Sequence, residues 1–165
     1  MTSLGRLAAA LVVVAVCVAL PFARTPAGGS RPVPTVAFTA VGLSFRYPAT
    51  WQRQTWSGDE ASFATPIVIL SGGGVLVSWD ADGFPISHLP TPNTTIGGHS
   101  AVETTTSGGA WCASLGGTET ITVMIPRAVP DNWYQMDACL RGPDLTQQDA
   151  QISSMLSSVR LAQGG

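Results

Sequence analysis

The chain has 165 residues, 45% hydrophobic and 11% charged, with a formal net charge of −2 at pH 7. This length and composition predict one compact domain and not a disordered chain. All eight basic residues besides histidine are arginines, and the missing lysine excludes Walker-type phosphate loops, Schiff-base enzymes, kinases and serine–lysine hydrolases.

Residues 1–27 have the layout of a secretory signal peptide. A basic start is followed by an uncharged apolar run of 14 residues, Leu7 to Leu20, then by Pro21 and small residues. A membrane-spanning helix needs about 20 apolar residues, so we expect cleavage more than permanent anchoring. Cys17 follows Val16 inside the apolar run, whereas a lipoprotein signal has a small residue before its cysteine, so we interpret Cys17 as part of the run.

Removal of this segment leaves a mildly acidic chain. Six arginines and ten acidic residues then remain, which gives a net charge of −4. This balance argues against nucleic acid as a partner, and it leaves membrane contact only to a signal segment that is not cleaved.

The predicted domain covers residues 35–162, after a flexible lead-in at 28–34 that is rich in Pro and Gly. Residues 35–40 and 42–47 are predicted to form a hairpin. In its second strand Leu43, Phe45 and Tyr47 share one face, and Pro48 ends the strand because it has no N–H to donate. Trp51 then fills the core just past the turn.

The middle of the chain predicts further strands and one long loop. Residues 67–70 are apolar on both faces, which indicates a central strand covered on both sides, and a glycine-rich turn leads into a partner strand at 75–79. Residues 80–93 contain three prolines and have no period. Binding function is expected on this loop, because long loops on a rigid scaffold often carry it.

The last third predicts strands followed by one helix. We expect strands at 94–106, 110–115, 119–125 and 132–140, and a helix that Asp144 caps with Gln147 as capping-box partner. Many strands and one amphipathic helix indicate an α+β fold, a central antiparallel sheet covered by helix. The apolar stripe of the helix consists of Leu145, Ile152, Met155, Leu156 and Val159.

Three short segments resemble PsbP-like domains. Residues 42–51 resemble the opening Gly-x-x-Phe-x-Tyr-Pro-x-x-Trp of that group, and residues 97–101 (Gly-Gly-x-x-Ala) and 155–159 (Met-Leu-x-Ser-Val) look like its middle and closing segments. The resemblance spans about residues 35–161. It implies an α/β/α sandwich and, for bacterial members, a secreted or envelope-bound domain that acts as a binding or assembly module. The lysine-free composition is also similar to that of secreted proteins from high-GC actinobacteria.

Cys112 and Cys139 are expected to form a disulfide, since an extracytoplasmic compartment favours pairing. They lie 27 positions apart, so the bond would contribute about 3.5 kcal/mol in the chain-entropy model. If 110–115, 119–125 and 133–140 were a three-strand meander, however, the cysteines would be about 9.5 Å apart, and a disulfide needs about 7 Å or less between Cα atoms. The bond therefore predicts that these segments do not form a meander.

The sequence shows no clear catalytic or metal site. His88 and His99 are the only candidate bases near neutral pH, and neither comes with a nucleophile motif. Asp80 and Asp82 begin like a calcium loop, but Phe84 and Pro92 stand where further oxygen ligands are needed. We therefore expect no cofactor, no metal and no enzymatic activity.

The tryptophans offer the clearest binding hint. Trp51, Trp79 and Trp111 are expected in the core, and Trp56 and Trp133 near an exposed rim, where aromatic residues favour partner contact. We therefore predict a secreted or envelope-associated, non-catalytic module for an unidentified protein or envelope component. Alternatives are a carrier or sensor of a small apolar ligand and, least favoured, an extracytoplasmic hydrolase. The predicted partner-binding residues are Trp56, Phe84, His88, Trp133 and Arg141.

Overall fold

The computed structural model describes residues 32–54, 66–81, 90–127 and 132–162. The chain divides into two units, Met1–Pro32 and Val33–Gly165, and all of the described strands and helices belong to the second. Of the described residues, 55% lie in strands and 17% in helices. The predicted domain boundaries themselves stay predictions.

Most of the described elements are strands. They are β1 (Thr35–Ala40), β2 (Leu43–Pro48), β3 (Gln52–Gln54), β4 (Pro66–Gly72), β5 (Val75–Ala81), β6 (Thr94–Ile96), β7 (His99–Ser107), α1 (Ala110–Ser114), β8 (Glu119–Pro126), β9 (Trp133–Leu140), α2 (Leu145–Ser157) and β10 (Arg160–Leu161).

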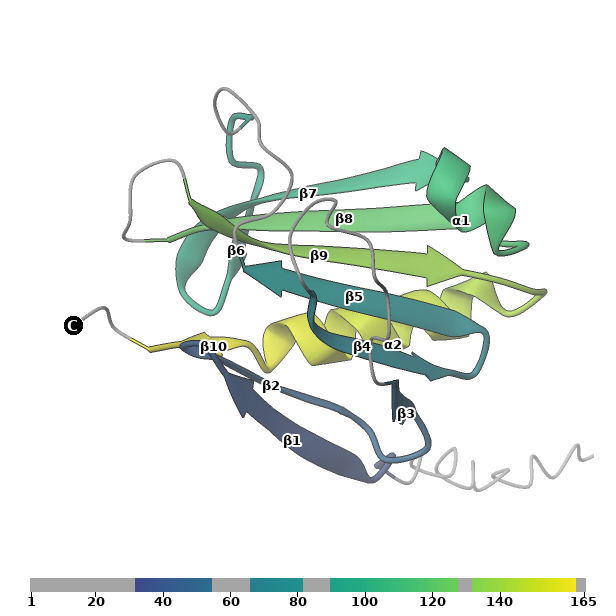
Figure 1. Cartoon of the computed structure of the whole chain (residues 1–165), viewed down its shortest axis with the longest axis horizontal. Helices are drawn as coiled ribbons and strands as arrows, with labels where there is room; N and C mark the ends of the chain where they lie inside the picture. The colour runs from purple at the N-terminus through teal and green to yellow at the C-terminus, as the bar shows by residue number, and fades with distance from the viewer. Residues whose placement is uncertain (1–31, 55–65, 82–89, 128–131, 163–165) are drawn as a thin grey trace, which may run out of the picture. The chain divides into compact units, whose positions relative to one another are not determined.

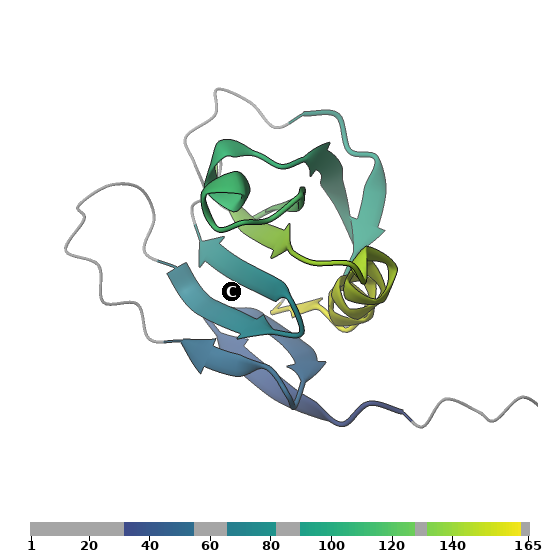
Figure 2. The ribbon, with the colours of Figure 1, turned by 90° about the vertical axis from the view of Figure 1, so that its right-hand side faces the viewer.

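The strands form two antiparallel sheets (Figure 1). One sheet has the order β1-β2-β10, and the other has the order β3-β4-β5-β9-β8-β7-β6. Viewed from the side, the seven-stranded sheet curves, and α2 and the three-stranded sheet lie against the same face of it (Figure 2). The C-terminal strand β10 pairs with β2, so the two ends of the domain meet in one sheet.

The predicted fold, an α+β arrangement with a central antiparallel sheet covered by helix in an α/β/α sandwich, is wrong. The described part of the chain is mostly β, with two antiparallel sheets and two helices, of which α1 has only five residues. The N-terminal hairpin and β10 form a sheet of their own beside α2, in place of a helical layer. The opposite face of the large sheet carries Thr122 and Asp137, which hydrogen-bond across neighbouring strands, and Ser78, which bonds Asp80 within β5. Among the described residues no long helix covers this face.

The N-terminal hairpin forms as predicted. β1 pairs with β2 from Thr35 opposite Pro48 to Ala40 opposite Leu43. Its turn consists of Val41 and Gly42, both with positive φ, 49° and 76°. The left-handed region is unfavourable for a β-branched residue. The Tyr134 hydroxyl donates a 2.6 Å hydrogen bond to the Val41 carbonyl and so ties this turn to β9 of the other sheet.

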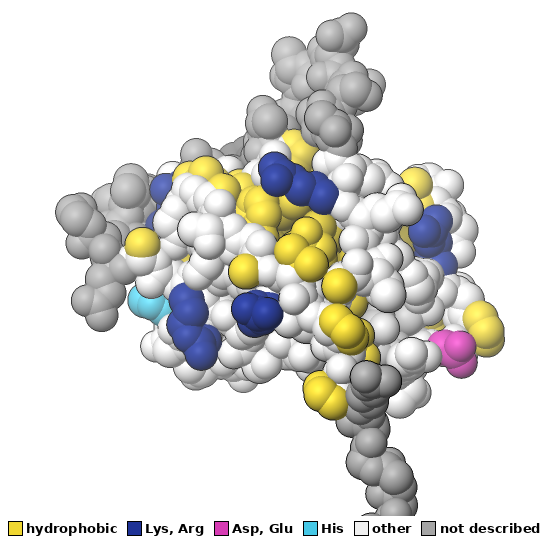
Figure 3. All heavy atoms as spheres, turned by 90° about the horizontal axis from the view of Figure 1, so that it is seen from below, with side chains coloured by type: hydrophobic (Ala, Val, Ile, Leu, Met, Phe, Trp, Pro, Cys, Tyr) yellow, Lys and Arg dark blue, Asp and Glu magenta, His cyan; other side chains and the backbone are white. Residues whose placement is uncertain are grey.

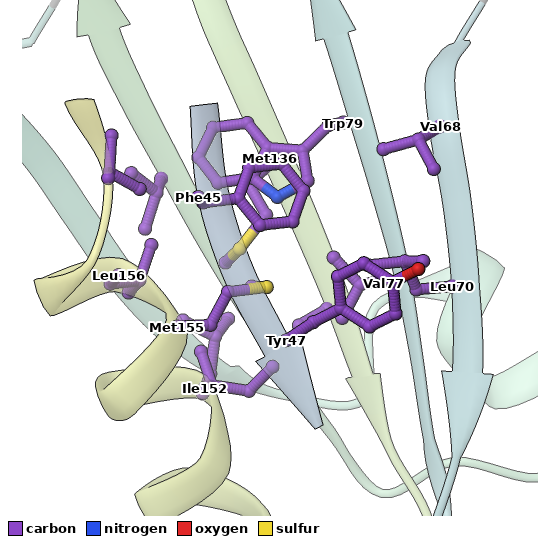
Figure 4. Packing of buried hydrophobic residues seen from close by; sticks show 14 of the residues in the cluster. Phe45, Tyr47, Val68, Leu70, Val77, Trp79, Met136, Ile152, Met155 and Leu156 are labelled. Carbon is purple, nitrogen blue, oxygen red and sulfur yellow. The ribbon is translucent and has the colours of Figure 1, made fainter. Parts of the chain in front are cut away.

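The core lies between the large sheet and the layer formed by α2 and β2 (Figure 4). Phe45 of β2 stacks on Trp79 of β5, with ring centroids 5.4 Å apart. From α2, Ile152 and Met155 project into the same cluster and are 1% exposed each. The period-two pattern of β2 and the helical stripe of α2 are thereby confirmed, because both apolar faces pack against one another.

Residues 110–115 do not form the predicted strand. Residues Ala110–Ser114 form α1, which places Cys112 within 5.2 Å of Cys139, measured between Cα atoms, and the two form a disulfide. The predicted pairing is confirmed, and the meander objection disappears because helix α1 replaces the first strand. Strands β7, β8 and β9 do follow one another in the sheet.

Two further local predictions need correction. Residues 67–70 lie in β4, next to the edge strand β3, and only Val68 and Leu70 on one face are buried, so this is not a central strand covered on both sides. Asp144 stands at the N-cap of α2 but its side chain makes no capping hydrogen bond. Instead, Gln148 joins the first turn to the preceding loop, because its amide bonds both the carbonyl and the N–H of Arg141, at 2.6 and 3.1 Å.

Candidate functional site

An open groove of about 570 Å³ lies between the β6–β7 hairpin and the C-terminal end of α2. The helix contributes Ser153, Leu156 and Ser157, and β10 contributes Arg160. The hairpin contributes Thr94, Thr95, Ile96, Gly97, Gly98 and Glu103. The groove therefore joins segments about 60 residues apart in the chain.

The turn of the hairpin sets one wall of the groove. Gly97 and Gly98 form a two-residue turn with φ of 61° and 86°, which glycine adopts without strain. A Cβ on Gly97 would lie 3.0 Å from the Val159 carbonyl oxygen, so the turn rests against the chain just after α2. Gly97 thus allows the hairpin turn to approach the chain that follows α2.

Opposite charges face the groove. The Arg160 Nη1 donates to the carbonyls of Ser157 and Val159, at 3.3 and 2.6 Å, which holds the guanidinium at the C-terminal end of α2. This is the end of a helix where a cation is electrostatically favoured. Glu103, on β7, is the acidic residue in the lining of the same groove.

The Asn93 amide fixes the backbone that carries Glu103. Its Nδ2 donates to the Glu103 carbonyl at 2.7 Å, and its Oδ1 accepts from the Glu103 N–H at 2.8 Å. The Asn93 amide thus satisfies the backbone N–H and carbonyl of Glu103, at the part of the β7 edge that β6 does not cover. A polar side chain replaces the neighbouring strand there, and Glu103 is held on a rigid frame.

Arginines also gather around the three-stranded sheet. Arg46 belongs to β2 and Arg160 to β10, and the Arg53 guanidinium lies 5.3 Å from the centroid of the Phe38 ring of β1. On the face seen in Figure 3, arginine side chains surround a central group of apolar side chains, and acidic side chains lie at the rim. Positive charge is thus concentrated on this face, although the chain has a net negative charge.

A second polar cluster lies on the opposite face of the large sheet. Asp137 accepts hydrogen bonds from Thr122 at 2.6 Å and from Gln135 at 2.7 Å, and Asp80 accepts one from Ser78 at 3.1 Å. Burial, and to a smaller extent the charge of Asp137, raise the pKa of the Asp80 carboxyl to about 6, against the lowering effect of the Ser78 bond. Within the described residues, no group of three or more potential metal ligands occurs here or elsewhere.

Of the predicted partner-binding residues, only Trp133 and Arg141 are described, and they lie at opposite ends of β9. Trp56, Phe84 and His88 lie outside the described residues. Trp133 was expected near an exposed rim but is 4% exposed, with its Nε1 3.4 Å from the Gln135 Oε1. Arg141 lies after β9, and its guanidinium is 3.5 Å from the Leu115 carbonyl.

The tryptophan assignment is partly reversed. Trp51 and Trp79 are buried as expected, at 4% and 0% exposure. Trp111 was expected in the core but is 42% exposed, because α1 turns it outward while Cys112 turns inward. His99 lies on the exposed end of β7, opposite Ile96.

Comparison with known proteins identifies no relative: the chain matches no family model and no curated protein. The resemblance to PsbP-like domains therefore stays a prediction from three short motifs. In the described part of the chain, the helices are too short to cross a membrane.

The groove was not predicted from the sequence. Its only sequence signals are the Gly97–Gly98 turn and the position of Arg160 directly after the amphipathic helix. Neither signal shows that the turn and the helix end lie side by side. That contact joins residues distant in the chain, and a local sequence pattern cannot predict it.

Proposed function

We propose that the mature chain is a secreted or envelope-associated, non-catalytic binding module whose partner occupies the groove between β6 and α2. The observation that carries this proposal is the pair Glu103 and Arg160, one fixed by Asn93 and one by two carbonyls, facing one open groove. Fixed groups of opposite charge on rigid elements suit recognition of a polar partner.

The disulfide supports an extracytoplasmic location. Cys112 of α1 and Cys139 of β9 form a fully buried disulfide, and such bonds persist in oxidising compartments. The N-terminal apolar run of 14 residues, which has the layout of a secretory signal, supports the same location.

The lining favours a polar ligand over the apolar ligand of a carrier. Four of the lining residues are threonine or serine, namely Thr94, Thr95, Ser153 and Ser157, and the apolar members Ile96 and Leu156 are only 5% and 6% exposed. The side chains between α2 and the large sheet, among them Met136 and Met155, are almost completely buried against one another.

The proposal is tested by nuclear magnetic resonance on the ¹⁵N-labelled mature protein. Peptide and oligosaccharide probes are titrated in, and we expect the amide shifts to concentrate at residues 94–98, 103, 153–157 and 160. Arg160→Gln and Glu103→Gln should weaken the response. Arg53→Gln is the matched control, since β3 is at the other edge of the sheet. Shifts elsewhere, or shifts that Arg160→Gln leaves unchanged, would contradict the proposal.

A further inference from the structure

The groove is bordered by a sheet edge. β6 is the last strand of the seven-stranded sheet and pairs only with β7 among the described strands. Its three residues, Thr94, Thr95 and Ile96, all line the groove. An edge strand presents N–H and C=O groups to which another extended chain can pair.

The phase of the β6–β7 pairing shows which backbone groups are presented. The turn has two residues, so the flanking pair Ile96 and His99 is hydrogen-bonded, and the pairs then alternate. The Asn93 N–H donates to the Ala101 carbonyl at 3.0 Å, which places a bulge there and agrees with a hydrogen-bonded pair of Thr94 and Ala101. Thr95, between these pairs, therefore directs its N–H and C=O away from β7.

The usable edge is short. Beyond one end, the Asn93 amide occupies the Glu103 backbone groups, and at the other end Gly97 rests on the Val159 carbonyl. An added strand can therefore pair at Thr95 over about three residues of chain. So short an edge suits the end of a chain better than a chain that continues in both directions.

A fixed cation lies where such a chain would stop. The Val159 carbonyl that accepts the 2.6 Å bond from Arg160 is the same oxygen that Gly97 approaches. The guanidinium is therefore held beside the Gly97 end of β6, where it complements a carboxylate.

We propose that the groove binds the C-terminal end of an extended peptide, which adds a short strand at Thr95 of β6 and places its terminal carboxylate on Arg160. The Glu103 carboxylate faces the same peptide and favours a basic side chain near that terminus. This inference rests on the proposed function, because it names the occupant of the same groove.

The test compares two synthetic peptide libraries on the immobilised mature protein. Both consist of random heptapeptides, one with a free C-terminal carboxyl and one amidated. We expect retention from the free-acid library to exceed retention from the amidated library by about tenfold or more. Equal retention from both libraries would overturn the recognition of a chain terminus.

Variants separate strand addition from other modes of binding. Thr95→Pro removes the outward N–H without touching a bond to β7, and it should weaken retention about tenfold. Thr95→Val keeps the N–H and should retain binding, as should Arg53→Gln. Arg160→Gln should abolish the preference for the free acid. Full retention by Thr95→Pro would refute strand addition.

A measurement on the unaltered protein covers the case in which Thr95→Pro does not fold. Amide hydrogen exchange at Thr95 should slow when a retained peptide is bound, and unchanged exchange would overturn the inference. If peptides bind the groove and Arg160→Gln releases them, but Thr95 exchange is unchanged, strand addition fails and the proposed function stands. If no peptide is retained and no probe shifts the groove amides, both fail.

Discussion

The carboxyl group of Asp80 should make the protein less stable as the pH rises through the range from about 4 to 6. Burial raises its folded-state pKa from 3.8 to about 6, so the folded protein binds this proton more tightly than the unfolded chain does. Stability falls with pH wherever the folded state binds more protons. The cost is therefore absent below about pH 4, grows up to about pH 6 and stays constant above it.

The size of this cost follows from the shift. A shift of about two units corresponds to about 3 kcal/mol at 1.36 kcal/mol per unit, and partial exposure of Asp80 to water reduces this to about 1–2 kcal/mol. Asp80→Asn keeps the shape and removes the charge. It should raise the free energy of unfolding by that amount at pH 7.5 and leave it nearly unchanged at pH 3.5.

Urea denaturation at the two pH values measures the difference, and a ¹³C titration of the Asp80 carboxyl measures the pKa directly. Ser78→Ala provides an internal check, because removing the bond that lowers the pKa should move the midpoint above that of the wild type. A wild-type midpoint near 4, or Asp80→Asn that destabilises the protein at pH 7.5, would refute the reasoning.

Three further changes test the fold. Replacing Cys112 and Cys139 with alanine should lower the free energy of unfolding by about 3.5 kcal/mol, since the bond closes a 27-residue separation; an unchanged urea midpoint would argue against this role. Val41→Asn should stabilise the protein by about 1 kcal/mol, because asparagine tolerates the φ of 49° better than a β-branched residue does, and a lower melting temperature would speak against that strain. Met155→Ala should cost about 2–5 kcal/mol, because this side chain is 1% exposed in the core, and a loss below 1 kcal/mol would mean that the core is not packed as described.

Periodic apolar patterns predicted the core well. Leu43, Phe45 and Tyr47 lie on one buried face of β2, and Ile121 and Val123 do the same in β8. Each of these strands is long enough to show alternation, and its buried face is continuous. The amphipathic stripe of α2 could be predicted for the same reason, because 13 residues make more than three turns.

Short elements and the arrangement of layers could not be predicted in this way. The five residues of α1 include no more than one and a half turns, so Trp111 and Cys112 fit a strand as well as a helix. The interpretation of Trp111 as buried followed from that strand. The sandwich was wrong for another reason: β10 has only two residues, and its pairing with β2 joins segments more than 100 residues apart.

The candidate site was expected on the 80–93 loop, of which residues 82–89 lie outside the description. The groove between β6 and α2 was not foreseen, although Gly97 and Arg160 were visible in the sequence. The two residues lie close together because both contact one oxygen, the Val159 carbonyl, which accepts a hydrogen bond from Arg160 and which Gly97 approaches. A contact of this kind arises only from the packing of the hairpin against the end of the helix.

The most direct test of the central claim is titration of a C-terminal peptide, selected from the free-acid library, into the ¹⁵N-labelled mature protein and its Arg160→Gln variant. We predict amide shifts concentrated at Thr95, Glu103 and residues 153–157 in the wild type, and an affinity at least tenfold lower in the variant. Shifts that lie away from the groove, or equal affinity in the two proteins, would contradict the account.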